Sequence, residues 1–137
     1  TVTNGITILL VALSAISLIV GGVGITNIMY VSVVERTFEI GLRRSVGAKR
    51  QDILYQFLTE SIILTFSGGI LGIVLALSLV SLIYVVANSY GLSWPFSISY
   101  GAIIFSILFS IMTGLFFGVY PAQKAANVDP IEALRKE

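Results

Sequence analysis

The chain has 137 residues, of which 56% are hydrophobic and only 11% are charged, and its net charge is +1. Soluble domains usually carry about 25% charged residues, so the composition argues against a soluble globular protein. The sequence contains no cysteine and no histidine, which excludes disulfides and the metal sites built from thiolates or imidazoles. It also lacks a basic cluster interleaved with aromatic residues, which disfavours nucleic acid as a partner.

Charged residues divide the chain into apolar and polar parts. The stretches Thr1–Val34 and Ser61–Gln123 carry no charge. Nine of the fifteen charged residues lie within Glu35–Glu60, and the other six lie within Lys124–Glu137. Each uncharged stretch exceeds the ~20 residues needed to cross ~30 Å of hydrocarbon. The pattern predicts an all-α membrane protein whose charged segments lie outside the bilayer.

The first uncharged stretch is long enough for one transmembrane helix, which we expect over about residues 6–30. It is too long for the apolar part of a signal peptide. Gly21, Gly22 and Gly24 lie in its second half. Each glycine costs a soluble helix roughly 1 kcal/mol relative to alanine, but in a bilayer glycine lets another helix approach closely.

The charged segment that follows, residues 33–56, has the spacing of an amphipathic helix. Its apolar stripe, with one residue at every fourth position, consists of Phe38, Leu42 and Val46. Glu39 and Arg43 form a favourable pair four residues apart. A solvated loop is the alternative interpretation of these charges. The stripe favours a continuation of the first helix, ended by Gly47, that docks on a cytoplasmic partner.

A second amphipathic pattern leads into the next span. Its face consists of Ile53, Leu54, Phe57, Leu58 and Ser61. We expect this helix to run from about Asp52 to Ala87 and to cross the membrane over about residues 57–87.

The uncharged stretch Ser61–Gln123 is too long for one span, so it must contain a hairpin, which we place at Asn88–Ser99. Gly91 and Pro95 disfavour helix there, and the aromatic rings around them favour the headgroup zone. The next span is expected over about residues 99–120. The candidates for its N-cap are Ser97 and Ser99.

The tail, residues 121–137, begins with Pro121, which we expect to end the third helix, with at most one further helical turn after it. Asp129, Pro130 and Glu132 match a capping box in which the proline takes the first helical position. The tail is therefore expected to end in a short surface helix over residues 130–136.

All basic residues fall outside the three spans and on one side of them. They are Arg36, Arg43, Arg44, Lys49, Arg50, Lys124, Arg135 and Lys136. The positive-inside rule therefore predicts a cytoplasmic charged segment and C-terminus, with the N-terminus and the hairpin outside. This orientation fits a chain whose preceding part, missing from this sequence, brought it across the membrane.

Small residues recur at every fourth position of the third span. They are Ala102, Ser106, Ser110, Gly114, Gly118 and Ala122, and the second span has a shorter series at Gly68, Gly72 and Ala76. Such stripes bring helix backbones together in membranes. Packing within one chain and a seam between two copies are both open.

The predicted spans contain no ionisable residue near their centres. Ion-coupled carriers need intramembrane charges, and an intramembrane protease needs a nucleophile with a base or paired carboxylates. The sequence also lacks a phosphate-binding loop. We therefore expect neither an enzyme nor a cofactor or metal site, but a membrane part that another protein moves.

Several stretches match one known family in order and spacing over nearly the whole chain. They are Ile16–Met29, Glu35–Ala48, Gln56–Glu60, Gly68–Gly72, Thr113–Ala122, Ala125-Ala126, Asp129-Pro130 and Glu132–Arg135. Together they resemble the FtsX-like permease family, and within it the MacB-type ABC transporter permeases. The chain departs from the family pattern at Phe38, where a charged residue is usual, and at Gln123-Lys124, where arginine is more common.

The resemblance implies a permease with four transmembrane helices and a large extracytoplasmic domain between the first two. This chain corresponds to helices two to four, and the upstream helix and that domain fall outside it. The segment 33–56 then contains a coupling helix seated on an ABC ATPase, which binds ATP. The residues implied in coupling are Glu35, Arg36, Phe38, Glu39, Gly41, Leu42, Arg43, Arg44, Gly47 and Ala48.

The mechanism that the resemblance implies is mechanotransmission, in which closure of the ATPase moves the helices and the extracytoplasmic domains move with them. The implied partners are the ATPase, a second identical or sister permease and an extracytoplasmic or periplasmic adaptor, in a bacterial or archaeal cell membrane. The expected process is export or efflux of a drug, peptide or lipoprotein. A cell-division FtsX-type scaffold that controls a wall hydrolase, and a channel or carrier acting alone, are the alternatives.

Overall fold

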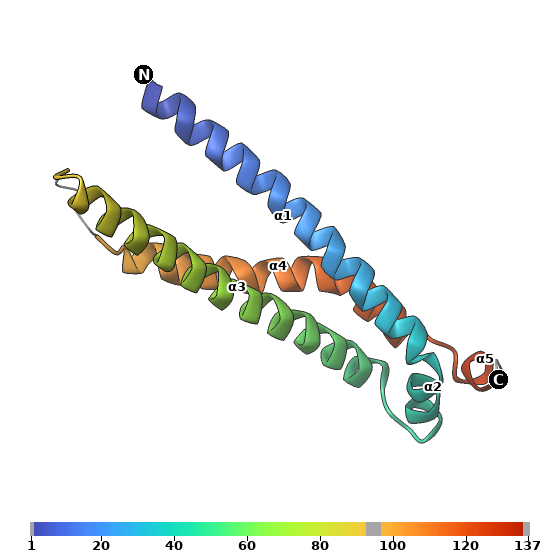
Figure 1. Cartoon of the computed structure of the whole chain (residues 1–137). Coiled ribbons are helices and arrows are strands. Elements are labelled where there is room, and N and C mark those ends of the chain that lie inside the picture. Colours follow the sequence, from blue (N-terminus) through green and yellow to red (C-terminus); the bar gives the residue numbers. More distant parts are fainter. Residues whose placement is uncertain (1, 93–96, 136–137) are drawn as a thin grey trace.

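A computed structural model describes residues 2–92 and 97–135 of the chain. The described residues form five helices and no strand: α1 Val2–Glu35, α2 Thr37–Ser45, α3 Arg50–Ser89, α4 Tyr100–Ala126 and α5 Pro130–Arg135 (Figure 1). Helices α1, α3 and α4 are long and apolar enough to cross a membrane. The predicted all-α class with three spans is confirmed.

Helices α3 and α4 form a hairpin, and α1 crosses it at an angle (Figure 1). Helix α1 contacts α4 more extensively than α3, and its buried residues, Gly22, Met29 and Val33, all lie in its second half. The first half of α1 diverges from the other two spans (Figure 1). The expected close approach of another helix to the glycines therefore occurs at Gly22, which lies against Phe117 of α4.

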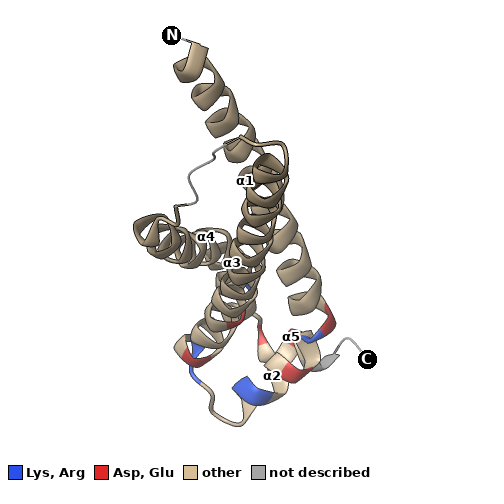
Figure 2. Cartoon of the chain, turned by 60° about the vertical axis from the view of Figure 1, so that its left-hand side comes forward, with Lys and Arg blue, Asp and Glu red and all other residues tan. Residues whose placement is uncertain are grey.

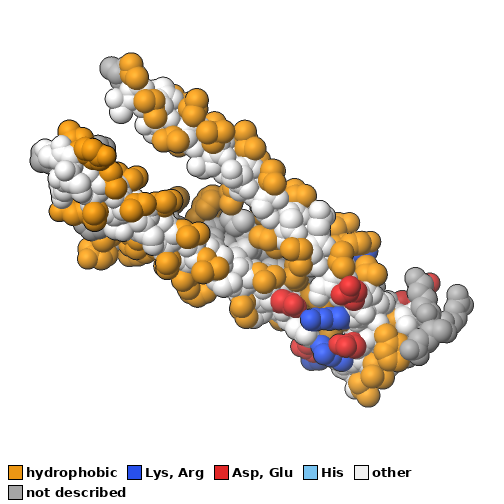
Figure 3. Space-filling view, viewed as in Figure 1, with side chains coloured by type: hydrophobic (Ala, Val, Ile, Leu, Met, Phe, Trp, Pro, Cys, Tyr) orange, Lys and Arg blue, Asp and Glu red, His pale blue; other side chains and the backbone are white. Residues whose placement is uncertain are grey.

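The buried core lies at the end of the molecule where α2 and α5 lie. It consists of Met29, Val33, Ile40, Ile53, Phe57, Ala122, Ala125 and Ala126. The predicted inner face of the second span is confirmed, because Ile53, Phe57 and Ser61 are buried and Leu54 and Leu58 pack beside them. Elsewhere the spans expose apolar side chains over most of the face seen in Figure 3, as expected for surfaces that contact lipid.

The first helix does not continue unbroken to Gly47 as predicted, because it is interrupted at Arg36 between α1 and α2. At this point the Thr37 hydroxyl donates a hydrogen bond of 2.9 Å to the Val33 carbonyl, and back-bonding of this kind bends helices. Gly47 does stop α2 as predicted. It adopts a φ of +106°, and the Ala48 N–H donates to the Arg43 carbonyl over 3.0 Å, as in a Schellman motif.

The prediction that Pro121 ends the third helix is wrong, because α4 runs through this residue to Ala126. Proline removes the N–H that would bond the carbonyl four residues earlier, which belongs to Phe117. A donor from another helix is available instead: the Thr26 hydroxyl of α1 lies 3.0 Å from the Phe117 carbonyl oxygen. Neighbouring helices and Thr side chains commonly make proline tolerable in membrane helices in this way.

The structure has the expected N-cap residues Ser99 and Asp129 at the starts of α4 and α5. The Ser99 hydroxyl accepts a hydrogen bond from the Ala102 N–H at the start of α4. The Asp129 carboxylate accepts one from the Ile131 N–H at the start of α5. In the hairpin, Gly91 has a φ of +75°, and Pro95 lies outside the described residues.

Candidate functional site: the charged end

The charged residues that the structure describes gather at one end of the molecule (Figure 2). They lie on α2, on α5 and on the adjoining ends of α1, α3 and α4. We call this region the charged end. Every residue that the sequence implied in coupling lies here.

Helix α2 presents two different faces at the charged end. Its inner face is packed, because Ile40 is buried in the core and Gly41 is buried against Ala133 of α5, where a Cβ at residue 41 would overlap the Ala133 side chain. Its outer face, which consists of Phe38, Glu39, Leu42, Arg43 and Val46, is exposed. The three apolar residues of the outer face are 42%, 49% and 81% exposed in chain order. The predicted apolar stripe is therefore uncovered in this chain.

The charges of the outer face are held only weakly. Glu39 and Arg43 form an ion pair at 3.8 Å between exposed side chains, and Arg43 also donates a hydrogen bond of 2.8 Å to the Gln56 side chain of α3. Exposed pairs of this kind contribute only about 0.2–1 kcal/mol. Both charges can therefore exchange these contacts for contacts with another protein at low cost.

Arg44 points the other way and ties α2 to the end of α4. Its Nη1 atom donates to the Ala126 carbonyl over 3.2 Å and to the Val128 carbonyl over 2.7 Å. The last carbonyls of a helix lack partners within the helix and carry the negative end of its dipole. The half-buried guanidinium of Arg44 therefore caps α4 from α2, while its Nε is buried without a hydrogen-bond partner among the described atoms.

Other polar contacts join the helices around α2. Arg36, at the break between α1 and α2, forms an ion pair at 3.6 Å with Glu60 of α3. Arg50 donates to the Asn127 side chain over 3.1 Å. The Lys124 ammonium donates to the Tyr30 hydroxyl over 2.7 Å and lies 4.0 Å from the ring centroid. The first contact connects the break between α1 and α2 with α3, and the other two connect the end of α4 with α3 and α1.

The remaining residues that the sequence implied in coupling lie in the segments that flank α2. Glu35 is exposed at the end of α1, Gly47 forms the turn after α2, and Ala48 packs beside the core. These residues set the direction of the chain on either side of α2.

Small residues bring α3 and α4 together just above the charged end. Gly114 lies against Ser61 and Thr65, and Gly118 lies against Ser61. The Ser110 hydroxyl donates to the Thr65 carbonyl, and Gly69 lies against Ser110. Packing within one chain therefore accounts for the second half of the predicted stripe on α4.

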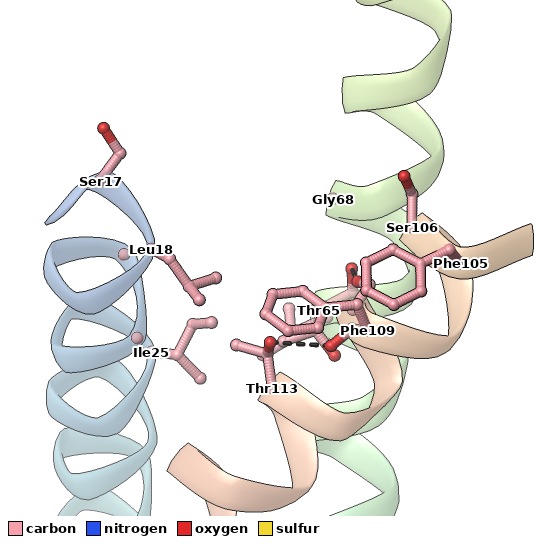
Figure 4. A pocket seen from close by; sticks show the side chains of 13 residues that line it. Ser17, Leu18, Ile25, Thr65, Gly68, Phe105, Ser106, Phe109 and Thr113 are labelled. Carbon is pink, nitrogen blue, oxygen red and sulfur yellow. Dashed lines mark hydrogen bonds between the residues drawn. The ribbon is translucent and has the colours of Figure 1, made fainter. Parts of the chain in front are cut away.

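The other predicted packing residues face open space in this chain. A Cβ added at Gly68 or Gly72 would meet no described atom within 4 Å outside its own turn of helix, and Ser106 is exposed. Gly68 and Ser106 line a groove of about 410 Å³ between α1 and the α3–α4 hairpin. Figure 4 shows Phe109 of α4 directed across this groove toward Leu18 and Ile25 of α1. A role of Gly68, Gly72 and Ser106 in contact with a second chain stays a prediction.

A family model described as FtsX-like permease C-terminal matches residues 11–130. The chain belongs to the FtsX-like permease family. The matched range includes α2, the outer face and the α3–α4 contact.

Similar proteins place this FtsX-like segment among ABC transporter permeases. It is 52% identical over 132 residues to the macrolide export ATP-binding/permease protein MacB of Bdellovibrio bacteriovorus, covering 96% of this chain and 20% of that protein. It is 48% identical over 136 residues to the uncharacterized ABC transporter permease YknZ of Bacillus subtilis, covering 99% of this chain and 33% of that protein. A MacB of Syntrophobacter fumaroxidans is 51% identical over 94% of this chain and 17% of its own length.

The FtsX-like chain thus spans between about a sixth and a third of the length of these relatives. The three apolar helices and the family together make it a multi-pass membrane segment of an FtsX/MacB-type ABC transporter permease. Among the described residues, no group of three or more Asp, Glu, His or Cys side chains could hold a metal ion.

Two features of this FtsX-like segment were not predicted from its sequence. The inward direction of Arg44 depends on the carbonyls of Ala126 and Val128, at and just after the end of α4, which are more than 80 residues away in sequence. The bond from Thr26 to Phe117 spans 91 residues. The signal for the second was present, because a proline within a membrane helix leaves a carbonyl that needs a donor.

Proposed function

We propose that this segment transmits ATP-driven motion of an ABC ATPase across the membrane to extracytoplasmic domains, supporting export or efflux. The observation that carries the proposal is the outer face of α2. It presents a contiguous apolar stripe at the end of the molecule where the described charges gather, beyond the uncharged parts of the spans.

The outer face has the properties of a docking surface. Exposed apolar area outside a membrane is unfavourable by about 25 cal/mol per Å², and Phe38, Leu42 and Val46 lie together on one side of a short helix. The partner that we propose to cover them is the ATPase, with Glu39 and Arg43 pairing at the rim of the contact. ATP is bound by that partner.

The inner face of α2 supports the second half of the proposal. Helix α2 is fastened to α5 by Gly41 and Ala133 and to α4 by Arg44. A displacement of α2 by the ATPase is therefore passed to α4 through direct contacts. It is also passed along the chain to α1 at Arg36 and to α3 at Gly47.

The proposed orientation places the charged end in the cytoplasm, because basic residues favour that side. The N-terminus of this segment and the α3–α4 hairpin then lie outside. A second permease copy, identical or a sister subunit, and an extracytoplasmic or periplasmic adaptor complete the proposed assembly. The names of the MacB relatives point to macrolides as one substrate; peptides and lipoproteins are the other classes that we propose.

The test compares two apolar-to-acidic substitutions at the charged end in the full-length permease. Leu42→Glu places a carboxylate in the proposed contact, whereas Ile131→Glu changes an exposed residue of α5 outside the outer face. We expect Leu42→Glu to reduce co-purification of the ATPase at least tenfold and Ile131→Glu to leave it unchanged. Equal ATPase retention by both variants would remove the outer face from the proposal. A parent permease that retains the ATPase but exports no substrate would favour the FtsX-type scaffold.

A further inference from the structure

Pro121 leaves a carbonyl of α4 without its usual partner. In an α-helix the carbonyl of Phe117 accepts the N–H of the residue four positions later, and proline has none. An unsatisfied backbone carbonyl inside a membrane costs several kcal/mol. A membrane helix that continues through proline therefore needs another donor at this point.

The Thr26 hydroxyl of α1 is that donor. It lies 3.0 Å from the Phe117 carbonyl oxygen and 3.2 Å from the carbonyl oxygen of Gly22 in its own helix. The Gly22 carbonyl already has the backbone N–H of Thr26 as its helical partner. The single hydroxyl proton is therefore needed at Phe117, and the shorter distance agrees with this assignment.

Phe117 of α4 also contacts a second residue of α1, which lies one turn from Thr26. The Phe117 ring occupies the space where Gly22 would carry a side chain. Gly22 and Thr26 are four residues apart and so lie on one face of α1. The two contacts together define the point at which α1 crosses α4 (Figure 1).

Burial differs on the two sides of this crossing. Toward the charged end, Met29 and Val33 of α1 are buried in the core. Toward the N-terminus, every described residue from Val2 to Gly21 is exposed except Leu18, which is half-buried. Helix α1 is therefore packed in the core on one side of the crossing and almost entirely exposed on the other.

We propose that Thr26 is a positioning residue whose hydroxyl replaces the missing N–H of Pro121 and makes the α1–α4 crossing a fixed pivot. About this pivot the N-terminal half of α1 changes its angle relative to the α3–α4 hairpin. The inference goes beyond the proposed coupling to an ATPase and does not depend on it.

Three substitutions separate the two roles proposed for the Thr26 hydroxyl, which are to satisfy the Phe117 carbonyl and to link α1 to α4. Thr26→Val keeps the shape of the side chain and removes the donor. Thr26→Ser keeps the donor. Pro121→Ala restores the N–H that bonds the Phe117 carbonyl within α4, so in the Thr26→Val background it satisfies the carbonyl without restoring the link between α1 and α4.

The measurements are the thermal unfolding midpoint of the full-length permease in lipid nanodiscs and a distance distribution between two spin labels. The labels are placed on cysteines at Leu9, in the N-terminal part of α1, and at Leu82, in the C-terminal part of α3, and both residues are exposed. These parts of the two helices lie at the same end of the molecule (Figure 1). This segment has no cysteine of its own, and any outside it are replaced first. Neither measurement requires the ATPase.

We expect Thr26→Val to lower the midpoint by at least about 2 °C and to broaden the distance distribution. Adding Pro121→Ala should recover the midpoint but leave the distribution broad, and Thr26→Ser should match the parent in both. Thr7→Val is the control, because among the described residues that hydroxyl bonds within α1, to the Thr3 carbonyl. A Thr26→Val variant with the parent's midpoint and distribution would overturn the inference, and so would a double variant whose midpoint stays low.

Discussion

Arg43 and Arg44 are neighbours in α2 but serve different contacts. Arg43 lies on the outer face and holds exposed partners, whereas the guanidinium of Arg44 is half-buried and caps the end of α4. The sequence placed both in one set of coupling residues, because a pattern of four-residue spacings does not reveal what covers each side of a helix. We infer that only Arg43 is available to a partner, and that Arg44 holds α2 in place.

The difference predicts unequal costs for the same substitution. Arg44→Gln removes two charge-assisted hydrogen bonds and should lower the free energy of unfolding by about 1.5–3 kcal/mol, whereas Arg43→Gln should cost less than about 1 kcal/mol. Thermal unfolding midpoints of the two full-length variants, measured in the same detergent, check this order. Equal midpoints would contradict the assigned role of Arg44.

At the scale of the helices, the contact between α3 and α4 depends on the absence of side chains on α4. A Cβ at Gly114 would overlap the Thr65 hydroxyl and lie 3.0 Å from the Ser61 carbonyl oxygen and 3.2 Å from the Ile62 Cα. Two of these neighbours are backbone atoms, which cannot move aside without shifting α3. Gly72 faces open space and provides a matched position without such neighbours.

Gly114→Ala should therefore separate α3 from α4 and destabilise the permease. Overpacking costs about 1–3 kcal/mol, which exceeds the gain of about 1 kcal/mol from replacing glycine within a helix. Gly72→Ala should leave the unfolding midpoint of the monomeric permease unchanged or raise it. The midpoints of the two variants, measured side by side, check the prediction, and an unaffected Gly114→Ala variant would show that the two helices do not meet as described.

The helices themselves could be predicted where one local pattern decides them. The inner face of α3 from Ile53 to Ser61 follows from helical periodicity, and the end of α2 at Gly47 follows from glycine's access to positive φ. The break at Arg36 and the continuation of α4 past Pro121 could not be predicted in this way. The back-bond of Thr37 does not by itself explain the break, since the same bond occurs at Thr59 and Thr113 inside unbroken helices. At Pro121 the donor that satisfies the free carbonyl comes from a different helix.

The same distinction between local patterns and contacts from distant parts of the chain applies to the candidate site. The outer face of α2 could be predicted, since Phe38, Leu42 and Val46 are spaced by four, and all three are exposed. The packing of Gly41 on Ala133 could not, because it depends on α5 folding back onto α2. Nor could the direction of Arg44, which depends on the carbonyls of Ala126 and Val128 at and after the end of α4. Gly68 and Gly72 share the spacing of the glycines that pack but point away from the described neighbours, so spacing alone does not select the partner helix.

At the scale of the whole molecule, the separation of charge predicts the orientation of the segment. Lys49 lies at the charged end, in the turn before α3, and Asn88 lies near the opposite end of that helix. Both are exposed. Helix α3 is 40 residues long, or about 60 Å at 1.5 Å per residue, which exceeds the ~30 Å of the hydrocarbon core.

Single cysteines at Lys49 and Asn88 of the full-length permease should therefore react on opposite sides of the membrane. In intact cells a membrane-impermeant maleimide should label Asn88→Cys and spare Lys49→Cys, and permeabilised cells should label both. Labelling of both residues in intact cells would contradict three crossings with the charged end in the cytoplasm.

The position of Thr26 divides α1 into arms of unequal length. From Thr26 to Glu35 the helix extends about 14 Å, and from Thr26 back to Val2 it extends about 36 Å. If α1 turns about Thr26 as a rigid rod, a shift at the end of the short arm, which carries Met29 and Val33 in the core, is enlarged at the tip of the exposed arm by a factor of about 2.7. Helix shifts at interfaces are on the order of 1 Å. If the end of the short arm at Glu35 moved by about 1 Å, the far tip of α1 at Val2 would move by about 2.7 Å.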